Sequence, residues 1–193
     1  GGQSGQYTLG EDKAVTLGRR ASALAREMDG SLLVTTSART PARATEALAA
    51  ELEVPHIMHE WRADQRENPY LGYLAIADQF IVTGESMSML TEACATGKPV
   101  HIFDLHDDAF PVTAGEWVRR LREAMGYRSL THRLAQRFAP VRMRRDISAL
   151  HDALIRDGRC VWLGDPLPAN EPPPLPDSSA AAERVLALLE NTA

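Results

Sequence analysis

The chain has 193 residues, of which 44% are hydrophobic, and its formal net charge at pH 7 is −5. The length fits one large domain, or a domain with an appendage, and it is enough to bury a sheet between two layers of helices. The negative charge argues against a nonspecific nucleic-acid surface, and no apolar run is long enough to form a transmembrane segment.

The two cysteines, Cys94 and Cys160, lie in apolar stretches. Cysteines in such surroundings are typical of buried thiols and not of a disulfide framework. We therefore expect a protein of a reducing compartment, the cytoplasm.

Residues 1–10 form a glycine-rich loop that opens with Gly-Gly-x-x-Gly. The pattern does not match the dinucleotide-binding fingerprint Gly-x-Gly-x-x-Gly, and a flexible terminus also explains it. A glycine-rich turn normally follows a strand, and none precedes this one in the sequence. We interpret the chain as a fragment of a longer protein, in which a purification scar could account for the first two glycines.

The next elements alternate between helix and strand. Apolar spacing predicts a helix over residues 11–28, ended by Gly30. A strand is predicted over residues 31–36. A further helix over residues 41–52 has Thr40 as its cap and a proline in its first position.

The loop after the first predicted strand carries the first candidate site residues. In open α/β sheets, ligands bind at the carboxyl ends of the strands. Arg39 can meet a phosphate as a forked donor, and Ser37 and Thr40 can hydrogen-bond beside it. Thr40 can act as a helix cap at the same time.

A short strand over residues 55–61 contains His56 and His59, which have no third ligand at a suitable spacing and do not predict a metal site. A helix is predicted over residues 68–77. In this helix Asn68 is either a cap or a cleft residue, and Tyr70 is either a packed or a cleft side chain.

The rest of the chain is organised around residues 77–101. Residues 80–82 form a short apolar run, typical of a buried parallel strand. Residues 83–86 supply turn chemistry. A helix follows, which Gly97 is placed to end and Pro99 prevents from continuing. A second apolar run completes the strand–helix–strand crossover of a parallel sheet.

The turn before this helix is a candidate anion site, because a helix N-terminus presents unpaired amides and the positive end of the dipole. Gly84 lets the backbone approach a ligand closely or take a positive φ, and Ser86 and Ser88 add hydroxyl donors. Glu92 lies one turn beyond Ser88, where its carboxylate can accept two hydroxyl hydrogen bonds. Alternatively, Ser86 is only a helix cap and Glu92 a solvated residue.

The remaining residues show weaker patterns. Asp104, Asp107 and Asp108 form a cluster of carboxylates that can hold Mg²⁺. Proline-rich residues 164–177 form an extended connector. The other expected elements are helices over residues 113–125, 146–156 and 178–190, a basic, partly helical stretch over residues 129–145, and an edge strand over residues 160–163.

Three blocks, residues 1–5, 35–41 and 68–100, occur in the order seen in a known family. They resemble the donor-nucleotide segment of glycosyltransferases with the two-Rossmann GT-B architecture. They are most similar to the mitochondrial fission protein ELM family, proposed glycosyltransferases of bacteria and plants. The resemblance covers most of residues 1–125.

The resemblance implies an α/β fold, a doubly wound, Rossmann-like parallel sheet that is the carboxyl-terminal half of a GT-B protein. Residues 1–163 would form the domain that binds a nucleotide sugar, residues 164–177 a connector and residues 178–193 a final helix. A preceding acceptor domain would supply the general base, so the chain alone would be inactive.

The resemblance also implies roles for individual residues. Backbone amides from Glu85 to Ser88 would stabilise the leaving diphosphate, with UDP as the favoured nucleotide, and Arg39 would add positive charge. Glu92 would hold the ribose, and residues 60–62 would flank the base. No metal or other cofactor is expected, which favours a solvated acidic loop over a Mg²⁺ site.

Two other functions are compatible with the same patterns. One is a nucleotide-sugar epimerase, which shares this fold and a glycine-rich turn that carries a glutamate. The other is a non-enzymatic scaffold that binds a fission dynamin.

Overall fold

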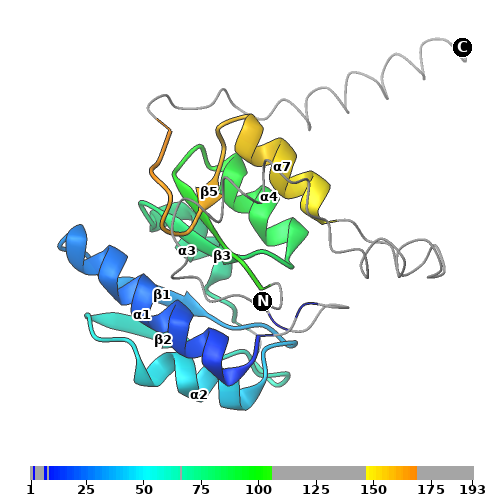
Figure 1. Cartoon of the computed structure of the whole chain (residues 1–193). Helices are drawn as coiled ribbons and strands as arrows, with labels where there is room; N and C mark the ends of the chain where they lie inside the picture. Colours follow the sequence, from blue (N-terminus) through cyan, green and yellow to red (C-terminus); the bar gives the residue numbers. More distant parts are fainter. Residues whose placement is uncertain (1, 3–6, 8, 66, 106–146, 169–193) are drawn as a thin grey trace, which may run out of the picture.

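A computed structural model of the chain describes residues 2, 7, 9–65, 67–105 and 147–168 (Figure 1). Helices and strands alternate along these residues, which confirms an α/β protein. The elements are α1 (Glu11–Glu27), β1 (Leu32–Thr35), α2 (Ala42–Ala50), β2 (His56–His59), α3 (Tyr70–Ile76), β3 (Phe80–Thr83), α4 (Met87–Ala95), β4 (Val100–Phe103), α7 (Ser148–Arg156) and β5 (Val161–Trp162).

All the described strand pairs are parallel, but they form two sheets where one was expected. One sheet pairs β1 with β2, and the other has the order β3-β4-β5. The predicted crossover is confirmed, since β3 and β4 flank α4 and pair from Phe80↔Val100 to Thr83↔Phe103. In Figure 1, α1 and α2 accompany β1 and β2 in one half, and α4 and α7 accompany the other sheet.

The two sheets share a hydrophobic core although no described strand joins them. One cluster contains Leu48 of α2, Phe103 of β4 and Leu163 after β5, with Val34 of β1 and Ile81 of β3 packed against it. A second cluster lies within the three-stranded sheet and its helices. It is formed by Val82, Leu90, Ala93, Cys94, Val100, Ile102, Leu154 and Cys160.

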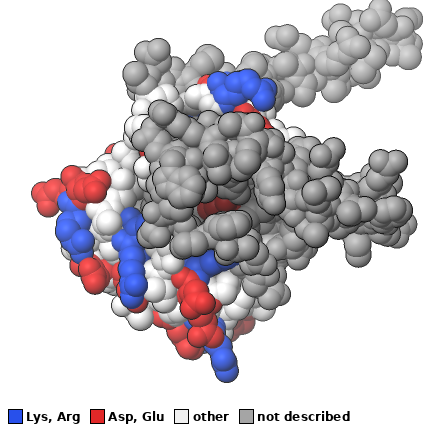
Figure 2. Space-filling view, in the orientation of Figure 1, with Lys and Arg blue, Asp and Glu red and all other residues white. Residues whose placement is uncertain are grey.

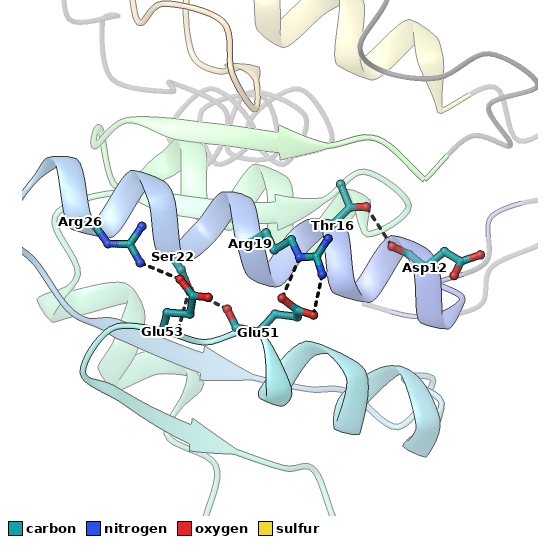
Figure 3. Close-up of polar contacts among 7 residues, drawn as sticks. All are labelled: Asp12, Thr16, Arg19, Ser22, Arg26, Glu51 and Glu53. Carbon is teal, nitrogen blue, oxygen red and sulfur yellow. Dashed lines mark hydrogen bonds and ion pairs between the residues drawn. The ribbon is translucent and has the colours of Figure 1, made fainter.

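Helix α1 lies directly on α2 and on the turn that follows it (Figure 3). Gly18 permits this approach, because a Cβ there would come within 2.9 Å of the Leu48 carbonyl oxygen. The buried Ser22 hydroxyl donates to the Glu51 carbonyl at 2.9 Å and accepts from the Glu53 amide at 3.0 Å. Figure 2 shows acidic and basic side chains interspersed over the side of the molecule that these helices form.

Two predicted helix caps are wrong. Helix α1 ends at Glu27 and is followed by Asp29 at φ 51°. The Gly30 amide donates to the Ala25 carbonyl at 2.8 Å, so the left-handed residue is the aspartate and not the glycine. Thr40 does not cap α2, because Pro41 occupies the N-cap position. Gly97, by contrast, takes a φ of 75° directly after α4, as predicted.

The carboxyl-terminal elements agree with the predictions as far as they are described. Ile147, at the N-cap of α7, and Leu154, within it, are buried, and β5 pairs with β4 alone among the described strands. Cys94 and Cys160 are free and buried thiols, as expected. The elements predicted within residues 106–146 and 169–193 lie outside the described residues. No helix within the described ranges is long and apolar enough to cross a membrane.

Candidate functional site

The turn between β3 and α4 is buried and held by the sheet. The Gly84 amide donates to the Phe103 carbonyl at 2.9 Å, and the Ser86 amide donates to the Thr83 carbonyl at 3.2 Å. The Ser86 amide is thus occupied by the turn itself, whereas the amides that a helix leaves without an intrahelical partner are those of its first turn, from Met87 onward. The expected span of amides therefore shifts toward the helix.

Ser86 occupies the N-cap position of α4, but its side chain makes no capping hydrogen bond and the residue is buried. The Ser86 hydroxyl therefore does not cap the helix, which was the alternative interpretation of this residue. Ser88, two residues further on, is exposed on the first turn of α4. Of the two serines, Ser88 presents its side chain to solvent.

Gly84 does not have a positive φ, so that reason for a glycine is wrong. The residue is instead packed against a neighbour that the sequence reasoning missed, His151 of α7. A Cβ at Gly84 would lie 3.1 Å from His151 Cε1 and 3.2 Å from Ile102 Cγ2. The turn is therefore part of the core, and not a free edge.

His151 is 2% exposed and holds the turn through its imidazole. Its Nε2 lies 2.7 Å from the Gly84 carbonyl oxygen, which only accepts, so Nε2 donates the hydrogen. The ring packs edge-on against Trp162, with centroids 5.3 Å apart. The sequence could have indicated that His151 is buried, because its helical spacing places it on the same face as the apolar Ile147 and Leu154.

Three segments that are distant in sequence meet beside this turn. The Gly2 amide donates to Oε1 of the buried Glu85 at 2.5 Å. A Cβ at Gly2 would collide with the Arg39 carbonyl group and the Thr40 amide. The loops that follow β1 and β3 therefore both contact Gly2.

The loop after β1 is held by its own side chains. The Ser37 amide donates to Thr40 Oγ1 at 3.0 Å, and the Thr40 amide donates to the Ser37 carbonyl at 2.9 Å. Arg39 is exposed. The three residues predicted in this loop thus lie together. Ser37 and Thr40 bond each other, whereas the Arg39 side chain faces solvent.

An open hollow of about 340 Å³ lies at the carboxyl ends of β1 and β2. It is lined by Thr36, Ser37, Ala38, Thr40, Ala42, Thr45, Glu46, Glu60 and Trp61. The Trp61 amide donates to Thr36 Oγ1 at 2.8 Å, which ties the two strand ends together. The hollow thus brings two predicted loop residues next to the segment expected to flank a nucleotide base.

Glu92 is exposed on α4 and accepts a hydrogen bond from the Tyr70 hydroxyl at 2.5 Å. Burial, together with this bond to a carboxylate, raises the pKa of Tyr70 above its usual range. The Asn68 side chain accepts from the Tyr70 amide at 3.0 Å, as a residue that starts a helix does. Tyr70 therefore fixes the carboxylate of Glu92 at the surface beside α3.

In chemical terms, amides at a helix N-terminus suit an anion, and a fixed carboxylate suits hydroxyl donors. Among the described residues, no group of three His, Cys, Asp or Glu side chains is placed to hold a metal ion.

The fold defines a parallel α/β protein, and its candidate site lies at the carboxyl ends of the strands. Comparison of the sequence with protein families identifies it further: the chain belongs to the mitochondrial fission ELM1 family, whose model matches residues 1–189. The predicted family is thereby confirmed.

Two curated relatives match part of the chain. It is 37% identical over 102 residues to mitochondrial fission protein ELM1 of Arabidopsis thaliana, and 27% identical over 104 residues to the uncharacterized protein RP120 of Rickettsia prowazekii (strain Madrid E). Each match covers 53% of this chain, but only 23% and 29% of the respective relatives. The chain thus spans less than a third of either relative. No solved structure matches it.

Proposed function

We propose that this chain is the donor-binding half of a glycosyltransferase of the GT-B class, with a Rossmann-like sheet that binds a nucleotide-diphosphate sugar. The observation that carries the proposal is the meeting of Gly2, the loop at Arg39 and the turn at Glu85 on one carboxyl edge. Nucleotides bind at this edge in open parallel sheets. The amino end of α4 at the same edge favours a diphosphate.

The neighbouring features suit the other parts of the ligand. Glu92 is fixed by the Tyr70 hydroxyl at the surface of α4, where its second oxygen can accept from a ribose hydroxyl. The hollow beside Trp61 offers an aromatic side chain, 42% exposed, for a base. Arg39 is exposed in the loop that contacts Gly2 and can add positive charge.

In this proposal the chain lowers the energy of the leaving diphosphate and does not activate the acceptor. Preorganised amides stabilise charge that develops on the leaving group without a metal ion. The acceptor site and the general base would come from a preceding domain. Free buried thiols fit a reducing location such as the cytoplasm.

The proposal is tested by titrating the chain with UDP and with other nucleoside diphosphates in a calorimeter. We expect saturable binding. Glu92→Ala should weaken it by about 1.5–3 kcal/mol, the scale of hydrogen bonds to a charged group. The same substitution should weaken binding of the 2′,3′-dideoxy analogue far less, because this analogue lacks the hydroxyl donors.

The matched control is Glu27→Ala, which removes an exposed carboxylate at the far end of α1. It should leave the affinity unchanged. Equal losses for the ribose and dideoxy ligands would remove Glu92 from the site. No heat and no thermal shift with any nucleoside diphosphate at millimolar concentration would refute the proposal as a whole.

A second candidate function is a non-enzymatic role in organelle fission. It is favoured by the name of the plant relative, a mitochondrial fission protein. The titration separates the two candidates, because a scaffold has no need to bind a nucleotide.

A further inference from the structure

The hollow at the carboxyl ends of β1 and β2 has two acidic side chains in its wall, those of Glu46 on α2 and of Glu60 directly after β2. Both residues are exposed, and neither side chain forms a hydrogen bond or an ion pair with any residue that the structure describes. No lysine, arginine or histidine is among the described residues that line the hollow. The wall therefore carries two carboxylates that no basic side chain of the same lining balances.

The hydroxyl groups of the hollow already have partners. The Thr45 hydroxyl donates to the carbonyl at the N-cap of α2 at 3.3 Å, and the Thr36 hydroxyl accepts from the Trp61 amide at 2.8 Å. The Ser37 and Thr40 hydroxyls bond each other at 3.3 Å. Apart from the indole N–H of Trp61, the polar side-chain groups that remain for a ligand are the two carboxylates, which only accept hydrogen bonds.

An aromatic side chain stands next to these carboxylates. Trp61 follows Glu60 in the chain and is exposed in the hollow, and its amide fastens the end of β2 to the end of β1. The volume of about 340 Å³ is in the range of small-molecule sites. An indole face stacks on any nucleobase, so stacking gives no choice among bases. The choice then depends on the hydrogen-bonding groups beside the ring.

The four common bases differ in what they present to a carboxylate. Guanine presents two adjacent donors, N1–H and the N2 amino group, which match the two oxygens of one carboxylate. Uracil presents one N–H between two carbonyl oxygens. Adenine and cytosine present an amino group beside a ring nitrogen that accepts. A carboxylate thus gains two hydrogen bonds from guanine, but meets the lone pairs of an acceptor on each of the other bases.

We infer that the hollow selects guanine, which stacks on Trp61 and donates N1–H and the N2 amino group to the carboxylate of Glu60. Glu60 is assigned this role because the same strand end carries the stacking indole, while Glu46 adds negative charge from α2. The inference rests on the proposed function and names its donor as a guanosine-diphosphate sugar. It departs from the uridine nucleotide that the family resemblance implied.

The test is a calorimetric titration of the chain with GDP, UDP, ADP, CDP and inosine diphosphate under the same conditions. We expect GDP to bind at least about tenfold more tightly than UDP, ADP or CDP, as hydrogen bonds to a charged group provide. Inosine diphosphate should be intermediate, because hypoxanthine keeps N1–H and lacks the N2 amino group.

Glu60→Gln tests the assigned carboxylate. The amide group keeps one acceptor but adds an NH₂ donor, which faces the donors of guanine and suits the carbonyls of uracil. The preference for GDP over UDP should therefore fall about tenfold or more, without a loss of UDP affinity. Glu46→Gln is the matched control, because it removes the other carboxylate of the same hollow. It should leave GDP the tightest ligand.

The outcomes separate this inference from the proposed function. Equal binding of all the nucleotides, or tightest binding of one other than GDP, would overturn the guanine inference and leave the nucleotide site standing. Binding of none would refute both. A preference for GDP that survives Glu60→Gln, or that disappears with Glu46→Gln alone, would overturn the role of Glu60. Circular dichroism verifies that the variants keep the fold, as expected for exposed positions.

Discussion

The two sheets of this protein are covered by helices in different ways. On the β1–β2 side, all the buried residues of α1 are small: Ala14, Gly18, Ala21, Ser22 and Ala25. On the β3–β4–β5 side, large side chains are fully buried beside the smaller Ala93 and Cys94 of α4. Leu90, Val100 and Ile102 are 0% exposed there. The buried face of α1 thus allows close backbone approach, while the three-stranded sheet buries large apolar side chains.

The difference indicates which interactions stabilise each half. Small residues bury little apolar surface, so the α1–α2 contact depends on polar bonds such as those of Ser22. Fully buried leucine and isoleucine side chains contribute through transfer and close packing. The proposed diphosphate turn lies in the second half, where a dense core can hold it in one geometry.

The largest expected effect is that of Ile102→Ala in the three-stranded sheet. This change leaves a cavity between β4 and the turn at Gly84, and should lower the free energy of unfolding by about 2–5 kcal/mol. Urea denaturation followed by circular dichroism measures it. The matched control, Ile57→Ala on β2, removes a side chain that is 62% exposed, and should change stability by no more than about 0.5 kcal/mol. Similar losses for both would abolish the contrast between the sheets.

A smaller effect is expected for His151→Phe. The new ring can keep the contact with Trp162, but leaves the buried Gly84 carbonyl without its donor, at a cost of about 1–3 kcal/mol. Nucleoside diphosphate affinity should fall as well, since the turn loses its support. Denaturation and calorimetry measure the two effects separately.

His56→Phe is the control for this prediction, because the His56 imidazole also bonds a backbone carbonyl, that of Val54 at 2.9 Å, but is exposed. Water can replace the lost partner there, so little change is expected. If His151→Phe were as well tolerated as His56→Phe, the histidine would not hold the turn.

The smallest effect is expected on the α1–α2 side. Ser22→Ala removes the hydroxyl that joins the Glu51 carbonyl to the Glu53 amide, and should cost about 1 kcal/mol, because water can reach the exposed Glu53. Arg19→Ala breaks only a solvent-exposed ion pair with Glu51, and should have no measurable effect in high salt. If Arg19→Ala lowered the free energy of unfolding more than Ser22→Ala, the surface ion pair, and not the buried hydroxyl, would stabilise the contact between α1 and α2.

The sequence alone predicted the order and type of the described elements. The crossover from β3 through α4 to β4 was expected within a residue of its observed ends, because the apolar period and the Gly97 and Pro99 signals are local. The helix over residues 11–28 was equally clear. Its cap was misassigned, because Asp29 and Gly30 are both compatible with a left-handed turn and only the hydrogen bonds distinguish them.

The candidate site was only partly predictable. Ser37, Thr40 and Ser86 were expected as ligand contacts, with a helix cap as the alternative for Ser86. In the structure Ser37 and Thr40 bond each other, and Ser86 makes no capping bond. Spacing can place a polar residue at the end of a strand. It does not say whether the hydroxyl is used by the ligand or by the loop itself, because both need the same donors and acceptors.

What the sequence by itself determined is the family and the alternation of helix and parallel strand, since both are written in runs of neighbouring residues. Only the tertiary structure decided that Gly2 would contact Glu85 across 83 positions, and that His151 would hold Gly84 across 67. It also decided that the described strands would divide into two sheets. Such contacts are set by packing between elements far apart in the chain, and no local pattern records which partner a buried polar group will find.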